Sequence, residues 1–101
     1  MDYQITLSPL ARHDLKEAIR YISLDSPLAA ERFAALLHAK TNVLRTHPEI
    51  GRVMPERADR AIREIIVKSY RVIYRIDSLN RHIEIARYWH AARGTPKIAS
   101  Y

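Results

Sequence analysis

Residues 63–75 read REIIVKSYRVIYR, and this stretch decides the fold. β-branched and aromatic residues, which favour strands, lie on both sides of Lys68-Ser69, a pair short enough to form a tight turn. We therefore predict antiparallel strands at residues 60–67 and 70–77. A third strand is expected at residues 82–90, after a turn at residues 78–81, so the second half of the chain forms a meander.

The first half of the chain carries the signals of one strand and two helices. Residues 3–7 alternate apolar and polar side chains, which indicates a short strand. Ser8-Pro9 and Ser26-Pro27 each place a capping residue before a proline, a common start of a helix. Apolar residues at helical spacing carry the first helix to about Leu24 and the second to a point just before His47-Pro48.

These elements predict a fold class. Residues 49–60 show no periodicity, and we expect a loop there. The element order is then β-α-α-β-β-β, an α+β fold in which a helical hairpin packs on an antiparallel sheet and the first strand returns to that sheet. We expect Leu15, Ile19, Phe33 and Leu37 to be buried between the hairpin and the sheet.

Length and composition limit what the chain can be. A chain of 101 residues has room for one core, so we expect a single domain over residues 1–101. The absence of cysteine and the presence of only 2 glycines exclude disulfide frameworks, thiolate chemistry and glycine-rich phosphate loops. No stretch is apolar enough to span a membrane, and the first residues lack the layout of a signal peptide, so we expect a cytoplasmic protein.

The net charge of +6 lies wholly in the second half of the chain. Residues 1–50 carry six Lys/Arg and six Asp/Glu, whereas residues 51–101 carry eleven Lys/Arg and five Asp/Glu. This asymmetry favours a polyanion or an acidic protein as the partner of the second half, although a basic surface can also serve solubility alone.

The sequence lacks the familiar catalytic and metal-binding signatures. It has no Gly-x-Ser-x-Gly motif, its acidic residues show no pairing typical of a two-metal site, and its five histidines include no i, i+4 helical pair for zinc. We therefore expect neither a cofactor nor a metal.

Cations and hydroxyl groups gather on the predicted meander. They are Arg63, Lys68, Tyr70, Arg71, Arg75, Arg87, Tyr88 and His90. Antiparallel pairing would bring Arg63, Arg71 and Arg87 within about 10 Å of one another, because neighbouring strands lie about 4.8 Å apart. Such a cluster overcomes its own repulsion either because carboxylates such as Glu64 interleave with it or because an anion binds there.

An anion site of this composition could cleave RNA without a metal. Arginine or lysine would stabilise the charge on the phosphorane, and His90 or Tyr88 would transfer protons. The alternative is a charged strand surface whose arginine stems pack over apolar neighbours. Because Arg87 and Tyr88 are adjacent in a regular strand, they face opposite sides of the sheet, so only one of them can join Arg71 unless a bulge intervenes.

Four segments together resemble a known family. They are REIIV at 63–67, YRVIYR at 70–75, IEI at 83–85 and RYWHAAR at 87–93. They are similar to segments of the RelE/ParE superfamily of toxins from type II toxin-antitoxin modules, and the resemblance extends over nearly the whole chain. The loop from Gly51-Arg52 to Glu56 and the ending WHAAR at 89–93 are nearer to ParE.

The resemblance implies one of two activities, because the superfamily holds both on one scaffold. Relatives of the ParE type bind DNA gyrase, which implies growth inhibition through gyrase and a role in plasmid stabilisation. The residues expected to contact the target are Arg63, Lys68, Arg75, Trp89 and Arg93.

Relatives of the RelE and YoeB type instead cut mRNA on the ribosome. In that alternative, the resemblance makes four residues catalytic: Arg71, Arg87, Tyr88 and His90. The lysine-rich segment of those enzymes is missing here, since Lys68 is the only lysine between residues 41 and 96. A third alternative is an inactive member that only binds its antitoxin.

The resemblance also implies a cognate antitoxin that forms a hetero-oligomer with the toxin. A disordered antitoxin segment would fold along the toxin and cover the sheet edge or an apolar groove. In the gyrase alternative, residues 89–101 form a basic, aromatic contact surface, and deletion of residues 94–101 is expected to leave the domain folded. We further expect Arg71 to be partly exposed, so that its loss costs little stability.

Overall fold

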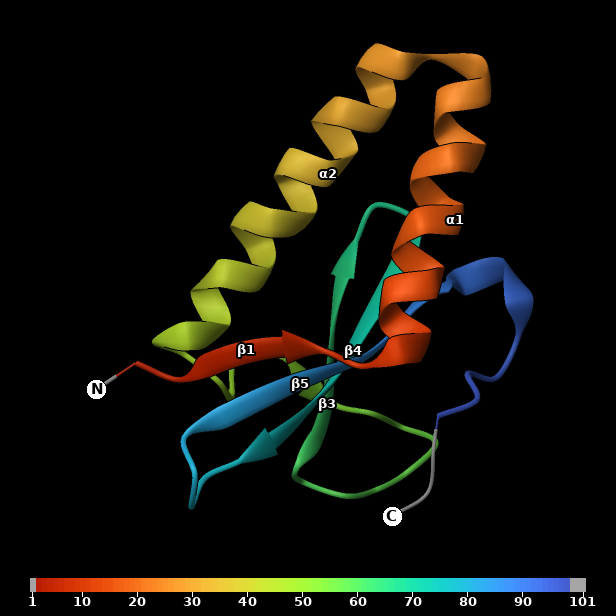
Figure 1. Cartoon of the computed structure of the whole chain (residues 1–101). Helices are drawn as coiled ribbons and strands as arrows, with labels where there is room; N and C mark the ends of the chain where they lie inside the picture. The colour runs from red at the N-terminus through yellow and green to blue at the C-terminus, as the bar shows by residue number, and fades with distance from the viewer. Residues whose placement is uncertain (1, 99–101) are drawn as a thin grey trace.

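The computed structural model describes residues 2–98 and shows two helices packed on one sheet (Figure 1). The elements are β1 (Gln4–Leu7), α1 (Pro9–Asp25), α2 (Pro27–Asn42), the 3₁₀ helix η1 (Val43–Arg45), β2 (Arg52–Val53), β3 (Ile62–Val67), β4 (Tyr70–Asp77), β5 (His82–His90) and the 3₁₀ helix η2 (Ala91–Arg93). The predicted α+β fold and its β-α-α-β-β-β order are confirmed. The structure adds one element to this order, the two-residue strand β2, which lies within the segment predicted as a loop.

The sheet has five strands in the order β1-β5-β4-β3-β2. β3, β4 and β5 form the predicted antiparallel meander, with Ile65 opposite Val72 in the first pair. The first strand does return to the sheet, but it runs parallel to β5, from Gln4 opposite His82 to Leu7 opposite Ile85. Because β1 ends at Leu7, no strand among the described residues lies beside this edge of β5 beyond Ile85.

Both helices begin at the predicted caps. The Ser8 hydroxyl accepts a hydrogen bond from the Ala11 backbone N–H at 3.0 Å, and Ser26 does the same for Ala29 at 3.1 Å. Ser8 also donates to the Ala86 carbonyl at 2.8 Å, which fixes the start of α1 against β5. Within residues 2–98, no helix is long and apolar enough to cross a membrane.

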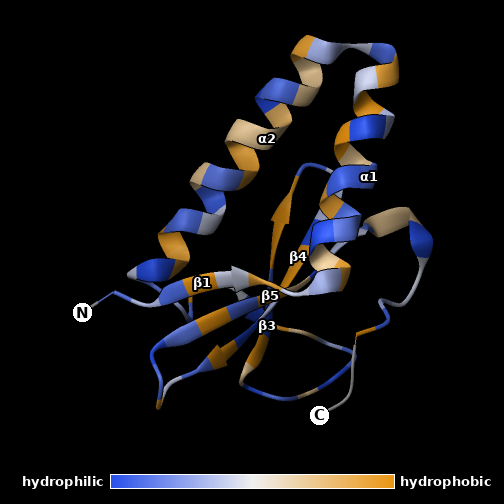
Figure 2. Cartoon of the chain, in the orientation of Figure 1, coloured by the Kyte–Doolittle hydropathy of each residue, from blue (hydrophilic) through white to orange (hydrophobic). Residues whose placement is uncertain are grey.

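The helical hairpin covers one face of the sheet and forms the main core with it. In Figure 2, polar and apolar residues alternate along both helices, as expected of helices with one buried side. Phe33 and Leu37 are buried as predicted, at 7% and 4% exposed. Leu15 and Ile19 are only partly buried, contrary to the prediction. The reason is that α1 and α2 diverge from the hairpin tip towards the sheet, and these two residues border the space between them (Figure 1).

The opposite face of the sheet carries a second, smaller core. Its buried members are Met54, Ile62, Ile73, Ala86 and Trp89, with Ile98 packed against them. The loop before β3 and the segment after β5 therefore cover this face, so part of the segment whose deletion is expected to leave the domain folded packs against the sheet. Gly94 accepts a hydrogen bond from the Trp89 indole at 3.1 Å, and the Lys97 carbonyl accepts one from Arg87.

A β-bulge in β5 sets which residues face the helices. Ile73 of β4 lies opposite Arg87, but Tyr74 lies opposite Ile85, so Ala86 is the extra residue. The bulge shifts the alternation by one position beyond it. As a result, Tyr88 packs with the main core under the helices, and Trp89 packs with the second core.

Replacing Phe33 by alanine tests the helix-sheet core. The Phe33 ring is buried and lies 5.2 Å from the Tyr70 ring between centroids. We expect Phe33→Ala to lower the free energy of unfolding by about 3 to 5 kcal/mol in urea denaturation. Leu28→Ala is the matched control, because Leu28 lies on the same helix at 53% exposure and its loss should cost no more than about 0.5 kcal/mol. Equal effects of the two changes would show that the buried face of α2 is wrongly assigned.

Candidate functional site

Arg71 is held by two carboxylates on the face of the sheet away from the helices. Its Nη1 and Nη2 donate to the Glu56 carboxylate at 2.9 and 2.8 Å, and its Nε donates to Glu64 Oε1 at 2.6 Å. The side chain is 12% exposed, so Arg71 is partly exposed as expected, but its two carboxylate partners argue against the expectation that its loss costs little stability. The hydrogen bond to Glu56 raises the pKa of Arg71, and in turn lowers the pKa of Glu56.

Glu64 lies at the centre of this network. Its side chain is fully buried, and its second oxygen, Oε2, accepts a hydrogen bond from Arg52 Nε at 2.6 Å. A buried carboxylate is tolerated only when paired, and here one guanidinium approaches from β2 and another from β4. The network therefore ties the loop before β3 to the sheet through Glu56 and Arg52. Interleaved carboxylates, one of the two alternatives raised by the sequence, account for Arg71.

Arg87 is paired with Asp14 of α1. Its Nε and Nη2 donate to the two Asp14 oxygens at 2.7 and 2.9 Å, and both residues are buried. The same carboxylate accepts the Tyr88 backbone N–H at 3.1 Å. The Arg87 guanidinium also lies 4.9 Å from the centroid of the Trp89 ring. The buried Arg87 thus connects the helical hairpin to the last strand.

Arg63 does not join the predicted arginine cluster. It lies opposite Tyr74, which packs in the core under the helices, whereas Arg71 lies opposite Trp89 of the second core. Strand alternation therefore places Arg63 and Arg71 on opposite faces of the sheet. Arg63 instead donates to the Gly51 and Arg60 carbonyls at 3.0 Å each, and so supports the loop on both sides of β2.

The other residues predicted to bind a target fall into two groups. Trp89 is buried, and Arg75 is partly buried with its guanidinium 3.6 Å from Glu84. Lys68 and Arg93 are exposed. Lys68 occupies the turn between β3 and β4 with a φ of 56°, and the Arg93 guanidinium lies 3.9 Å from the centroid of the Trp89 ring.

Tyr88 and His90 lie on the helix-covered face, at the end of β5. Burial raises the pKa of Tyr88 to about 12, so its hydroxyl is neutral at pH 7. The His90 ring lies edge-on to Tyr70 at 5.1 Å between centroids, and its Nδ1 accepts the Ala92 backbone N–H at 3.1 Å. Both residues border a hollow of about 340 Å³ that His13 and Arg93 also line.

Three of the four predicted catalytic residues, Arg87, Tyr88 and His90, border this hollow, whereas Arg71 does not. Arg71 lies on one face of the sheet, whereas Tyr88 and His90 lie on the other, and Arg87 is occupied by Asp14. The bulge does not change this separation, because it lies before Arg87 and leaves Arg87 and Tyr88 on opposite faces. In the part of the chain that the structure describes, no three His, Asp or Glu side chains are grouped so as to hold a metal ion.

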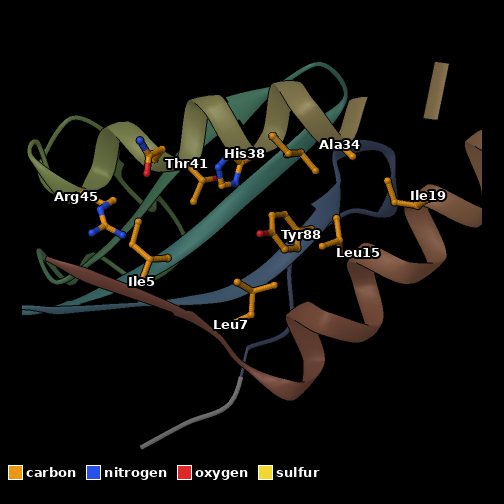
Figure 3. A pocket seen from close by; sticks show the side chains of 11 residues that line it. Ile5, Leu7, Leu15, Ile19, Ala34, His38, Thr41, Arg45 and Tyr88 are labelled. Atoms are coloured by element: carbon orange, nitrogen blue, oxygen red, sulfur yellow. The ribbon is translucent and has the colours of Figure 1, made fainter. Parts of the chain in front are cut away.

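A larger groove lies between the two helices, over β1 and β5 (Figure 3). Its volume is about 450 Å³, and its lining is apolar along most of its length, with Leu7, Leu15 and Ile19 among the lining residues. Sequence reasoning missed the polar residues that α2 and η1 contribute to it, which are His38, Thr41, Asn42 and Arg45. One signal was present: Thr41 continues the apolar stripe of α2 formed by Phe33 and Leu37 at four-residue spacing, where a polar side chain is out of place.

Comparison with known protein families decides what kind of protein this is. The family model described as the ParE toxin of the type II toxin-antitoxin system parDE matches residues 5–94. The chain belongs to this family. The predicted relationship to the RelE/ParE superfamily is thereby confirmed, and the match to the ParE toxin family extends over nearly all of the described residues.

Two solved structures share the fold of this ParE-family chain. The toxin-antitoxin complex RelBE2 from Mycobacterium tuberculosis contains a chain with 23% sequence identity and a TM-score of 0.63, covering 89% of this chain and 99% of that one. The chromosomal ParDE system from P. aeruginosa gives 16% identity and a TM-score of 0.70, covering 87% and 95%. No curated protein sequence shows significant similarity to the chain. The structural likeness supports the fold and does not separate the two activities of the superfamily.

Replacing Arg71 by alanine tests whether this residue is structural. The change would leave the buried Glu64 with Arg52 alone, so we expect a loss of about 3 to 5 kcal/mol in the free energy of unfolding, measured by urea denaturation. Arg57→Ala is the control, because Arg57 lies in the same loop as Glu56 and is exposed. A variant as stable as the parent would restore Arg71 as an available ligand for a phosphate.

Proposed function

We propose that the protein is a growth-inhibiting toxin that acts on DNA gyrase and is neutralised by a cognate antitoxin. Membership of the ParE family supports this proposal, together with the geometry of the sheet. The observation that carries it is the pairing of Arg71 with Glu56 and Glu64, because a guanidinium held by two carboxylates is not free to bind a phosphate. The protein then acts by binding its target rather than by cleaving RNA.

Only some of the residues expected to contact the target are accessible to a large partner. Of the residues expected to do so, Arg63 supports a loop and Trp89 is buried, so neither presents its polar group to a large partner. Lys68 and Arg93 are exposed, and both lie at the end of the sheet where β4 begins and β5 ends. We propose that these two cations contact an acidic region of the target.

The antitoxin is proposed to occupy the groove between the helices. The groove is apolar along most of its length and open to solvent, as expected for a surface that binds the apolar side of a partner segment. The chain carries a net charge of +6, which favours an acidic partner. Both structural neighbours come from toxin-antitoxin systems, which agrees with this assignment.

A ribosome-dependent ribonuclease is the second candidate, and one observation favours it. His13, Tyr88 and His90 border the same hollow of about 340 Å³ as Arg87 and Arg93, so proton-transfer groups and cations do lie close together there. This group excludes Arg71, and it would have to bind the substrate and perform the chemistry without that residue.

Induction of the protein in growing cells separates the two functions. If the protein acts on gyrase, we expect double-strand breaks and a DNA-damage response while amino acid incorporation into protein continues. The double variant His13→Ala/His90→Ala should remain toxic, because neither histidine performs chemistry in that case. A ribonuclease would stop protein synthesis first, and the double variant would reduce mRNA cleavage by about 10² to 10⁴. That outcome would refute the gyrase proposal, and an absence of growth arrest on induction of the parent would refute both.

A further inference from the structure

The groove between the helices has two chemically different ends. Leu15 and Ile19 line one end, and Thr41 and Arg45 lie at the other (Figure 3). The eleven lining residues include no aspartate or glutamate, so the groove itself supplies no negative charge. An occupant therefore meets apolar side chains at one end and polar groups at the other.

The Thr41 hydroxyl is a buried polar atom without a partner. Thr41 is 8% exposed, and its Oγ1 has no hydrogen bond to any described residue. A hydroxyl in a helix can bond to the carbonyl four residues earlier, but this one does not. Leaving a buried polar group unsatisfied costs free energy, so such a group in a groove points to a ligand atom that completes its bonding.

The groups around Thr41 can all donate hydrogen bonds. The Tyr88 hydroxyl is neutral and points towards the Thr41 end of the groove (Figure 3). His38, Asn42 and Arg45 line the same end, and none of their side chains is paired within residues 2–98. A group that only accepts hydrogen bonds satisfies every one of these donors, and among protein side chains the ionised carboxylate is that group.

We propose that the groove binds an amphipathic segment of an acidic partner, with aliphatic side chains between Leu15 and Ile19 and one carboxylate at the donor-rich end formed by Thr41, Tyr88 and Arg45. This proposal rests on the proposed function, because that function identifies the partner as the antitoxin. What it adds is the chemistry by which the toxin recognises its cognate antitoxin. The volume of about 450 Å³ suits a few side chains of a docked segment rather than a whole domain. A carboxylate buried beside Arg45 would form a charge-assisted hydrogen bond, which is stronger than a neutral one.

Thr41→Val gives a test in which stability and binding change in opposite directions. Valine has a similar shape without the unsatisfied hydroxyl, so the melting temperature of the free chain should rise by a few degrees. Affinity for the partner should fall about tenfold, because one hydrogen bond to a carboxylate is lost. The probe is the small protein encoded beside the gene for this chain, titrated calorimetrically into the purified toxin. Thr46→Val is the control, because the Thr46 hydroxyl is exposed and already bonded to His47.

A charge exchange identifies the carboxylate. Arg45→Glu should weaken binding by tenfold or more, whereas Arg32→Glu, an equal charge change at an exposed position of α2 outside the groove, should weaken it much less. Changing each acidic residue of the partner to lysine in turn should then find one position that restores binding to Arg45→Glu and not to the parent.

The outcomes separate this inference from the function on which it rests. If the partner binds the parent tightly but Thr41→Val and Arg45→Glu bind as the controls do, the carboxylate site is wrong and the toxin assignment stands. If the neighbouring protein does not bind the parent at all, the antitoxin assignment fails and the inference fails with it. If the free chain dimerises in sedimentation experiments and Arg45→Glu makes it monomeric, the occupant of the groove is a second copy and the inference is overturned.

Discussion

The structure depends on the pairing of Asp14 with Arg87. β1 pairs with β5 only as far as Ile85, and within residues 2–98 no strand lies beyond that point to accept the backbone donors on this edge of β5. The Asp14 carboxylate takes that place, because it accepts the Tyr88 N–H and two bonds from the Arg87 guanidinium. One side chain of α1 thus fixes the helix across the last strand. This position of α1 leaves α2 to diverge from it, and the groove between the helices results.

The same pairing of arginine with carboxylate recurs elsewhere in the basic sheet. Arg71 and Arg87, two of the residues predicted to be catalytic, each lie against buried carboxylates, which accept the hydrogen bonds that a phosphate would otherwise accept. Arg63 donates hydrogen bonds to loop carbonyls instead. Exposed cations outside this set, such as Lys68 and Arg93, remain accessible to partners.

The helices and strands could be predicted from the sequence, but the contacts between them could not. Ser-Pro pairs and period-two alternation are local signals, and they placed both helices and the three meander strands within a few residues. The bulge at Ala86 is not a local signal, since it is visible only in the pairing with β4, and it decides that Tyr88 faces the groove. The pairing of Asp14 with Arg87 spans 73 residues, which no spacing rule detects. Leu15 and Ile19 have the pattern of core residues, and only the divergence of the helices leaves them partly exposed.

The central claim is that buried carboxylates pair with the arginines of the sheet and so stabilise the fold. A double-mutant cycle on Asp14 and Arg87 tests this claim. The free energies of unfolding of the parent, Asp14→Ala, Arg87→Ala and the double variant would be measured by urea denaturation. We predict a coupling of about 2 to 3 kcal/mol, because each single change leaves the other charge buried and unpaired, whereas the double change does not. A coupling below about 0.5 kcal/mol would mean that the two residues contribute independently, and it would return Arg87 to the residues available for binding or catalysis.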